Sequence, residues 1–160
     1  MSRRRRTSTR TSTAPELNTA AGDLEHADLN EEYLEGGCFY LAEALSRRLG
    51  WPIELIVEGP RGEEDVVHAY VIDPQSGRAL DITGFSARPD LLLRYGIGDV
   101  PSRLHGARRI VYFLTPTRFR RRMLRMLESN GGVADETEYG DRVDRAEQIW
   151  DAHLLPRVKK

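Results

Sequence analysis

Apolar and polar residues follow two periodicities along this chain, one typical of helices and one typical of strands. After Gly37, apolar side chains recur at intervals of three and four residues, which predicts an amphipathic helix that ends at Gly50 and Pro52. Its apolar positions are Cys38, Leu41, Ala42, Leu45 and Leu49. The middle of the chain instead holds short apolar runs separated by turns rich in Gly and Pro, the pattern of strands. We expect strands at residues 52–59, 66–73, 78–83 and 107–115.

Helical patterns flank this central region. A short helix or a pair of turns is expected at 23–35, and a helical turn at 91–95 with Ser86 as its cap. Two further helices are expected at 117–129 and 140–155. Their predicted buried side chains are Phe119, Met123, Met126 and Leu127 in the first, and Val143, Ile149, Trp150 and Leu154 in the second. A helix, then strands joined by hairpin-length turns, then helices, predicts an α+β domain with an antiparallel sheet.

The composition is that of a water-soluble domain. The chain has 160 residues, of which 39% are hydrophobic and 31% charged, enough for one domain and one core. No apolar run approaches the roughly 20 residues that cross a bilayer, and the basic start is followed by no signal-peptide stretch. The single cysteine forms no internal disulfide, which suits a reducing compartment. We therefore expect a cytoplasmic protein that does not bind membranes.

The charge is distributed unevenly. The net charge is −1, yet residues 1–13 contain five arginines and no acidic residue. A segment of Arg, Ser and Thr buries too little apolar surface to fold alone. We expect residues 1–20 to be a disordered basic tail, in weak contact with nucleic acid, and residues 21–160 to be a single domain.

The strands at 66–73 and 78–83 suggest a specific geometry. If the turn places Asp73 opposite Arg78, one face of the hairpin carries only apolar side chains, and the other carries His68, Tyr70 and Asp81. His68 and Asp81 are then diagonal neighbours with Cα atoms roughly 7–8 Å apart. The register decides this, because a turn one residue longer or shorter moves Asp81 to the opposite face. We expect the helix that begins at Cys38 to cover part of the His68 face.

These three residues are the parts of a nucleophilic site. A thiol attacks as thiolate, which a helix N-terminus and an adjacent imidazole favour. A carboxylate on the far ring nitrogen fixes the tautomer. We interpret Cys38 as nucleophile, His68 as general base and acid, and Asp81 as the group that orients His68. Gly36 and Gly37 allow a substrate backbone to approach, and the Cys38 amide offers one oxyanion donor.

Residues 36–84 resemble the transglutaminase-like and papain-like cysteine enzymes. The resemblance rests on "GGC" before a helix, "HAY" on a following strand and "LDI" on the next strand. It implies a papain-like fold and hydrolysis or transfer at a peptide or glutamine-type amide, as in a thiol protease, deamidase or transglutaminase-like enzyme, with no cofactor. Tyr70 stands where that superfamily has Trp, and no Gln precedes Cys38; Asn30 is a candidate oxyanion donor in its place. Gly36, Gly37, Tyr70 and Asn30 are the predicted substrate-binding residues.

Other interpretations of the same residues remain open. Cys38 lies on the stripe of Leu41 and Leu45 and suits a small buried hydrophobe, while His68 and Asp81 also suit the solvated side of a hairpin. No metal site is expected, because the Cys and His spacing fits no zinc motif. The helix at 117–129 is basic, which gives a rival function: a non-catalytic protein of a phage or other mobile element that binds nucleic acid or a protein partner. Its binding residues would be Arg118, Arg120, Arg121, Arg122 and Arg125.

Overall fold

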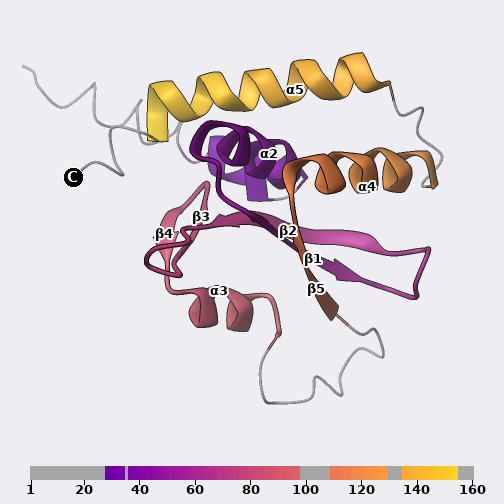
Figure 1. The fold of residues 1–160 in the computed structure, drawn as a ribbon, viewed down its shortest axis with the longest axis horizontal. Helices are drawn as coiled ribbons and strands as arrows, with labels where there is room; N and C mark the ends of the chain where they lie inside the picture. Colours follow the sequence, from indigo (N-terminus) through magenta and orange to yellow (C-terminus); the bar gives the residue numbers. More distant parts are fainter. Residues whose placement is uncertain (1–27, 35, 98–108, 130–134, 155–160) are drawn as a thin grey trace, which may run out of the picture.

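A computed structural model describes residues 28–34, 36–97, 109–129 and 135–154. They form an α+β fold around an antiparallel sheet of five strands in the order β4-β3-β2-β1-β5 (Figure 1). The strands are β1 (Ile53–Glu58), β2 (Asp65–Ile72), β3 (Ala79–Asp81), β4 (Gly84–Ser86) and β5 (Arg109–Leu114). The helices are α2 (Cys38–Leu49), α3 (Arg88–Arg94), α4 (Pro116–Ser129) and α5 (Glu136–Ile149), which continues into the π-helical turn η1 (Trp150–Leu154). Residues 28–34 are also helical. The predicted α+β class is confirmed, and the predicted tail at 1–20 lies outside the described residues.

The helices lie on both faces of the sheet. Helices α2, α4 and α5 cover one face, with α2 between the sheet and α5, and α3 covers the other (Figure 1). Side chains alternate between the faces along each strand. On the α2 side the core contains Leu55, Val71 and Leu80 together with Leu41 and Leu45. On the α3 side a smaller cluster contains Ile56, Tyr70, Ile72, Ala79 and Leu91.

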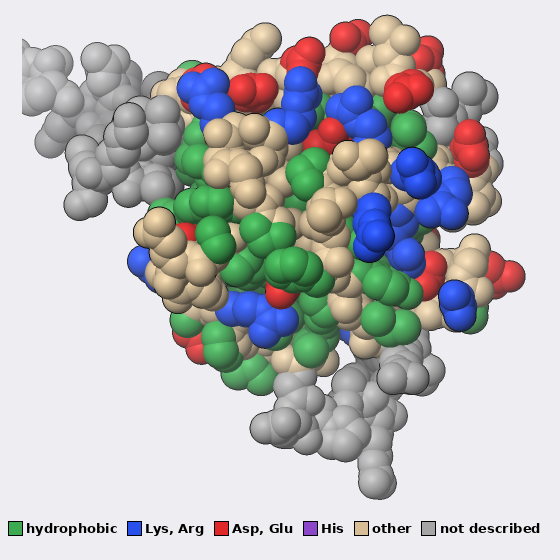
Figure 2. All heavy atoms as spheres, in the orientation of Figure 1, with side chains coloured by type: hydrophobic (Ala, Val, Ile, Leu, Met, Phe, Trp, Pro, Cys, Tyr) green, Lys and Arg blue, Asp and Glu red, His purple; other side chains and the backbone are tan. Residues whose placement is uncertain are grey.

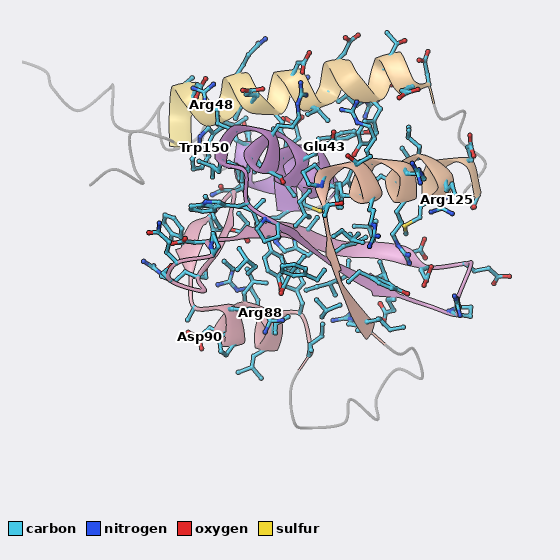
Figure 3. All side chains as sticks on the ribbon, viewed as in Figure 1. Glu43, Arg48, Arg88, Asp90, Arg125 and Trp150 are labelled. Carbon is cyan, nitrogen blue, oxygen red and sulfur yellow. The ribbon has the colours of Figure 1, made fainter. Side chains whose placement is uncertain are left out.

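Helix α2 is buried on almost every side, which its amphipathic pattern does not predict. Glu43 and Ser46 are 3% and 1% exposed, because α4 and α5 cover the surface that faces away from the sheet. Arg120 of α4 donates to Glu43 Oε1 over 2.7 Å, and the Tyr139 hydroxyl of α5 donates to Glu43 Oε2 over 2.9 Å. Figure 3 shows Glu43 between these helices. One buried carboxylate therefore joins α2, α4 and α5.

The region after β3 differs from the prediction. Residues 84–86 form β4, which pairs with β3 so that Asp81 lies opposite Gly84 and Ala79 opposite Ser86. Gly84 has a φ of +100°, a conformation that suits glycine in the tight turn between the strands. Helix α3 then begins after Ala87, so Ser86 belongs to a strand and does not cap the helix.

Candidate active site

The hairpin of β2 and β3 has the predicted register. Val71 lies opposite Leu80 and Ile72 opposite Ala79, and the Asp73 amide donates to the Arg78 carbonyl over 2.9 Å. This register brings His68 and Asp81 together, with 3.0 Å between His68 Nε2 and Asp81 Oδ2. The two side chains are 0% and 2% exposed. The alternative in which they lie on a solvated face of the hairpin is therefore wrong.

Asp81 is held by both of its carboxylate oxygens. While Oδ2 faces His68, Oδ1 accepts from the Thr83 amide over 2.8 Å and from the Thr83 hydroxyl over 2.6 Å. Burial by itself raises the pKa of Asp81, but the hydrogen bonds from His68 and Thr83 outweigh it and the pKa falls below its usual value. Asp81 is consequently a buried, ionised carboxylate with a fixed orientation.

His68 is fixed by its neighbours on the α3 side of the sheet. Its ring stacks on Tyr95 with 4.4 Å between ring centroids, and Tyr70 lies at 5.8 Å. Among the described residues, no group forms a hydrogen bond with His68 Nδ1, although this nitrogen is buried. A neutral ring that donates from Nε2 to Asp81 presents Nδ1 as an acceptor. The ring is thus oriented by a carboxylate at one nitrogen and unoccupied at the other.

Cys38 shares a small, buried cavity with these two residues. Cys38 is the first residue of α2 and is 4% exposed. The cavity, here called the Cys38 cavity, is too small to admit a water molecule and is lined by Tyr33, Cys38, Leu41, Ala42, Leu45, His68, Ala69, Tyr70, Leu80, Asp81 and Ile82. Burial raises the pKa of the thiol to about 11, opposed mainly by a hydrogen bond with the Ala69 backbone. The thiol is therefore protonated at neutral pH in this arrangement.

The route by which Cys38 reaches the cavity differs from the prediction. Helix α2 packs on the face that carries Val71 and Leu80, not on the His68 face. However, β3 pairs with β2 only at Val71 and Ile72, and the thiol forms a hydrogen bond with the backbone of Ala69, outside that paired stretch. Thiol and imidazole therefore line the same cavity, although α2 packs on one face of the sheet and the His68 ring lies on the other. Among the described residues no hydrogen bond joins them.

The predicted substrate-binding residues lie in three different places. Gly36 and Gly37 line an open groove outside the cavity. Tyr70 is fully buried, and its hydroxyl donates to Glu54 Oε2 over 2.6 Å, so it belongs to the packing around His68 rather than to an open cleft. Asn30 lies in the helical segment 28–34 and lines neither the Cys38 cavity nor this groove.

Glu54 extends this packing towards α3. Its carboxylate accepts from Arg88 Nε over 2.9 Å as well as from Tyr70, and Figure 3 shows Arg88 at the start of α3. Because Glu54 is 5% exposed, its charge is compensated by Arg88. The Tyr70 ring beside His68 is thus tied to two elements of the fold.

Tyr33 and Tyr95 are site residues that the sequence reasoning did not identify. Tyr33 closes one side of the Cys38 cavity, and Tyr95 covers the His68 ring. The helical pattern of 23–35 contained a signal for Tyr33, which lies on its apolar side. No local pattern connects Tyr95 with His68, because they meet only when α3 folds against the sheet.

The described residues contain no group of three or more His, Cys, Asp or Glu side chains arranged to hold a metal ion. None of the helices within the described ranges combines the length and apolar character needed to span a bilayer. In the comparisons with known proteins, no family model matches the chain, and neither a curated protein nor a solved structure matches it. The site is therefore interpreted from its own geometry.

Proposed function

We propose that this chain is a cysteine hydrolase or acyltransferase of papain-like type that acts on peptide or glutamine-type amides. Cys38 is the nucleophile, His68 the general base and acid, and Asp81 the residue that orients His68. The observation that carries the proposal is the surroundings of His68. One nitrogen of this buried imidazole contacts a buried carboxylate, the other has no hydrogen-bond partner among the residues that the structure describes, and a thiol lines the same cavity. A purely structural histidine would more often have both nitrogens satisfied.

The chemistry follows from these positions. His68 Nδ1 accepts the thiol proton, the sulfur attacks the amide carbonyl, and the proton passes to the leaving amine. Water attacks the resulting thioester in hydrolysis, and an amine attacks it in transfer. Asp81 keeps the proton of the resting ring on Nε2 and stabilises the imidazolium. Helix α2 begins at Gly37 without a side-chain cap, so the Cys38 amide at its first turn is a donor for the oxyanion.

The closed cavity has a direct consequence for activity. Burial is the largest cause of the raised pKa of Cys38, while the backbone amides near the sulfur favour the thiolate. Opening the cavity to substrate removes the first effect and retains the second. The thiol is therefore reactive only when the cavity is open, which protects it from oxidation in the resting protein.

Alkylation tests the proposal. Iodoacetamide labelling of Cys38 is followed by intact mass from pH 5 to 10 in the native protein, in His68→Ala, and in both proteins unfolded in urea. Because the reagent reaches the thiol only while the cavity is open, native labelling at alkaline pH is slower than labelling in urea. An imidazole that accepts the thiol proton in the open state makes native labelling persist below pH 7 and makes it drop in His68→Ala, while both proteins react at identical rates in urea. If native labelling follows an ordinary thiol and ignores His68→Ala, the assignment of His68 as base is wrong. Ammonia release from glutamine peptides, with Cys38→Ser as control, then measures turnover.

A second candidate function is favoured by the arginines of α4. Arg120 and Arg122 form ion pairs with the buried carboxylates of Glu43 and Glu64, so this candidate rests on the other three predicted arginines. Arg118, Arg121 and Arg125 are exposed and have no acidic partner within the described ranges. Figure 2 shows basic side chains gathered over the region of α4, and Figure 3 shows Arg125 on that helix. Three unpaired like charges on one helix surface favour contact with a polyanion such as nucleic acid.

Retention on a polyanion resin separates this candidate from the first. Replacing Arg118, Arg121 and Arg125 by Gln lowers the salt concentration at which the protein elutes. The matched control replaces Arg47, Arg48 and Arg94, which changes the net charge equally. Equal shifts for the two variants show that only net charge matters, and the second candidate is then dropped.

A further inference from the structure

An open groove lies directly outside the Cys38 cavity. It is lined by Gly36, Gly37 and Tyr40 near the start of α2, and by Arg142 and Arg145 of α5. Glu32 and Tyr33 complete its wall. The predicted approach over the two glycines therefore coincides with an actual depression of the surface. The function proposed above does not explain the two arginines in it.

Tyr33 separates the groove from the cavity, since it lines both. Its side chain is 3% exposed and lies against the backbone of Gly37. A Cβ atom at Gly37 would lie 3.0 Å from Tyr33 Cδ1, so the glycine makes this contact possible. The helical segment that carries Tyr33 is joined to α2 by a hydrogen bond of 2.9 Å from the Gly37 amide to the Glu32 carbonyl. One aromatic side chain thus lies between the thiol and solvent.

The groove has an excess of positive charge. Arg142 and Arg145 are 56% and 66% exposed, and Glu32 is the one acidic residue among the lining residues that the structure describes. Glu32 Oε2 lies 3.7 Å from Arg145 Nη2, a long contact that leaves most of the guanidinium donors unused. Arg142 is bound to Glu138 outside the groove at 2.6 Å and lies over the Tyr40 ring at 5.6 Å from its centroid. Both guanidinium groups are therefore positioned beside the groove and remain accessible to an anion.

We infer that this groove binds the carboxylate of an acidic peptide substrate through Arg142 and Arg145, and that displacement of the Tyr33 side chain admits the adjacent amide to Cys38. The inference rests on the proposed function for the reaction, but the groove's charge preference and the role of Tyr33 do not depend on catalysis. A carboxylate gains bidentate partners in the two guanidinium groups and replaces Glu32 at Arg145. Lysine-rich peptides meet like charge at the same place and are disfavoured.

Two thiol reagents of similar size and opposite charge test this inference. The sulfonatoethyl and trimethylammonioethyl methanethiosulfonates each form a disulfide with the Cys38 thiolate and release methanesulfinate. Their rates are measured by intact mass in the wild type and in Arg142→Gln/Arg145→Gln. If each guanidinium charge is taken as roughly 8 Å from the charge of the reacting reagent in about 0.15 M salt, the ratio of the anionic to the cationic rate is about three- to fivefold higher with the arginines than without them. The matched control is Arg47→Gln/Arg48→Gln, which removes two exposed arginines outside the groove and leaves the ratio unchanged.

Tyr33→Ala tests the partition. Both reagents react with Cys38 at least about tenfold faster in this variant than in the wild type. The reason is that loss of the phenol ring opens the cavity and removes the burial that disfavours the thiolate. The charge preference is measured again in Arg142→Gln/Arg145→Gln/Tyr33→Ala. A ratio that ignores the arginines overturns the groove assignment, and unchanged rates in Tyr33→Ala overturn the partition. Neither result depends on His68, so failure here is distinguishable from failure of the proposed triad, which the His68→Ala experiment measures.

Discussion

Removal of the Asp81 carboxylate is the most informative perturbation of stability. Asp81→Ala deletes three hydrogen bonds, of 3.0 Å from His68 and of 2.8 and 2.6 Å from Thr83. It leaves the His68 ring nitrogen and the Thr83 amide without their acceptor, and His68 is fully buried. Leaving a buried donor without its acceptor costs about 1–3 kcal/mol, so the two donors together cost about 2–6 kcal/mol. We expect a loss of that size in the free energy of unfolding, out of a total of about 5–15 kcal/mol for an ordinary domain.

Urea denaturation followed by tryptophan fluorescence measures this loss. With a slope of about 2 kcal/mol per molar urea, the midpoint falls by about 2 M. Asp73→Ala is the matched control, because Asp73 also accepts a backbone amide and a hydroxyl, from Gln75 and Ser76, but in an exposed turn. Its midpoint moves much less, because water replaces the lost partners.

A double-mutant cycle with His68→Ala isolates the pair itself. If His68 and Asp81 interact directly, the loss in the double variant is smaller than the sum of the two single losses by about 1.5–3 kcal/mol, the usual strength of a hydrogen bond to a charged group. Additive losses, or an Asp81→Ala midpoint equal to that of Asp73→Ala, refute the reasoning that the buried hydrogen bond between His68 and Asp81 organises this site.

Three further predictions concern acid, packing and the helix junction. Because the pKa of folded Asp81 is lowered, the stabilisation by its carboxylate is present above the ordinary aspartate pKa of about 3.9 and is lost as the pH falls through the lowered value. Below about pH 4 the wild type therefore loses more unfolding free energy than Asp81→Asn does. Urea titrations at several pH values measure the difference, and parallel curves for the two proteins contradict it. Gly37→Ala forces a methyl group against Tyr33 and lowers the free energy of unfolding by about 1–3 kcal/mol, measured as a lower urea midpoint. The control Gly36→Ala, at an exposed position with no atom near the added Cβ, changes the midpoint little. Equal midpoints would show that Gly37 is not closely packed. Tyr139→Phe removes the 2.9 Å hydrogen bond to buried Glu43 and costs about 1–3 kcal/mol by thermal or urea unfolding, and a neutral result would mean that the carboxylate is satisfied without it.

The parts of the fold that sequence reasoning predicted are those controlled by local signals. Helix α2 ends at Gly50, whose φ of +71° suits a glycine cap, and its amide donates to the Ser46 carbonyl. The turn between β2 and β3 fixes the register, and the register brings His68 to Asp81. For such features a few neighbouring residues determine the result.

The remaining features depend on contacts between distant residues. Arg120 and Glu43 are 77 positions apart, and no pattern near either of them indicates their pairing. Helix α2 packs on the face of the sheet that carries Val71 and Leu80, and no pattern within α2 indicates which face it covers. Closure of the Cys38 cavity requires Tyr33 from another segment. The contact between His68 and Asp81 was therefore predictable from the sequence, but their enclosure in a cavity with Cys38 was not.

The burial of Glu43 has a consequence for which side of the Cys38 cavity can move. A carboxylate clamped by partners from α4 and α5 makes any tilt of α2 expensive, since movement would strand a charge away from water. We therefore expect α2, which carries the sulfur, to keep its position when a substrate binds. The change in shape is then expected on the opposite wall of the cavity, where the Tyr33 side chain lies against Gly37. If the proposed function holds, substitutions at and around Tyr33 are therefore expected to change substrate specificity more readily than substitutions in α2.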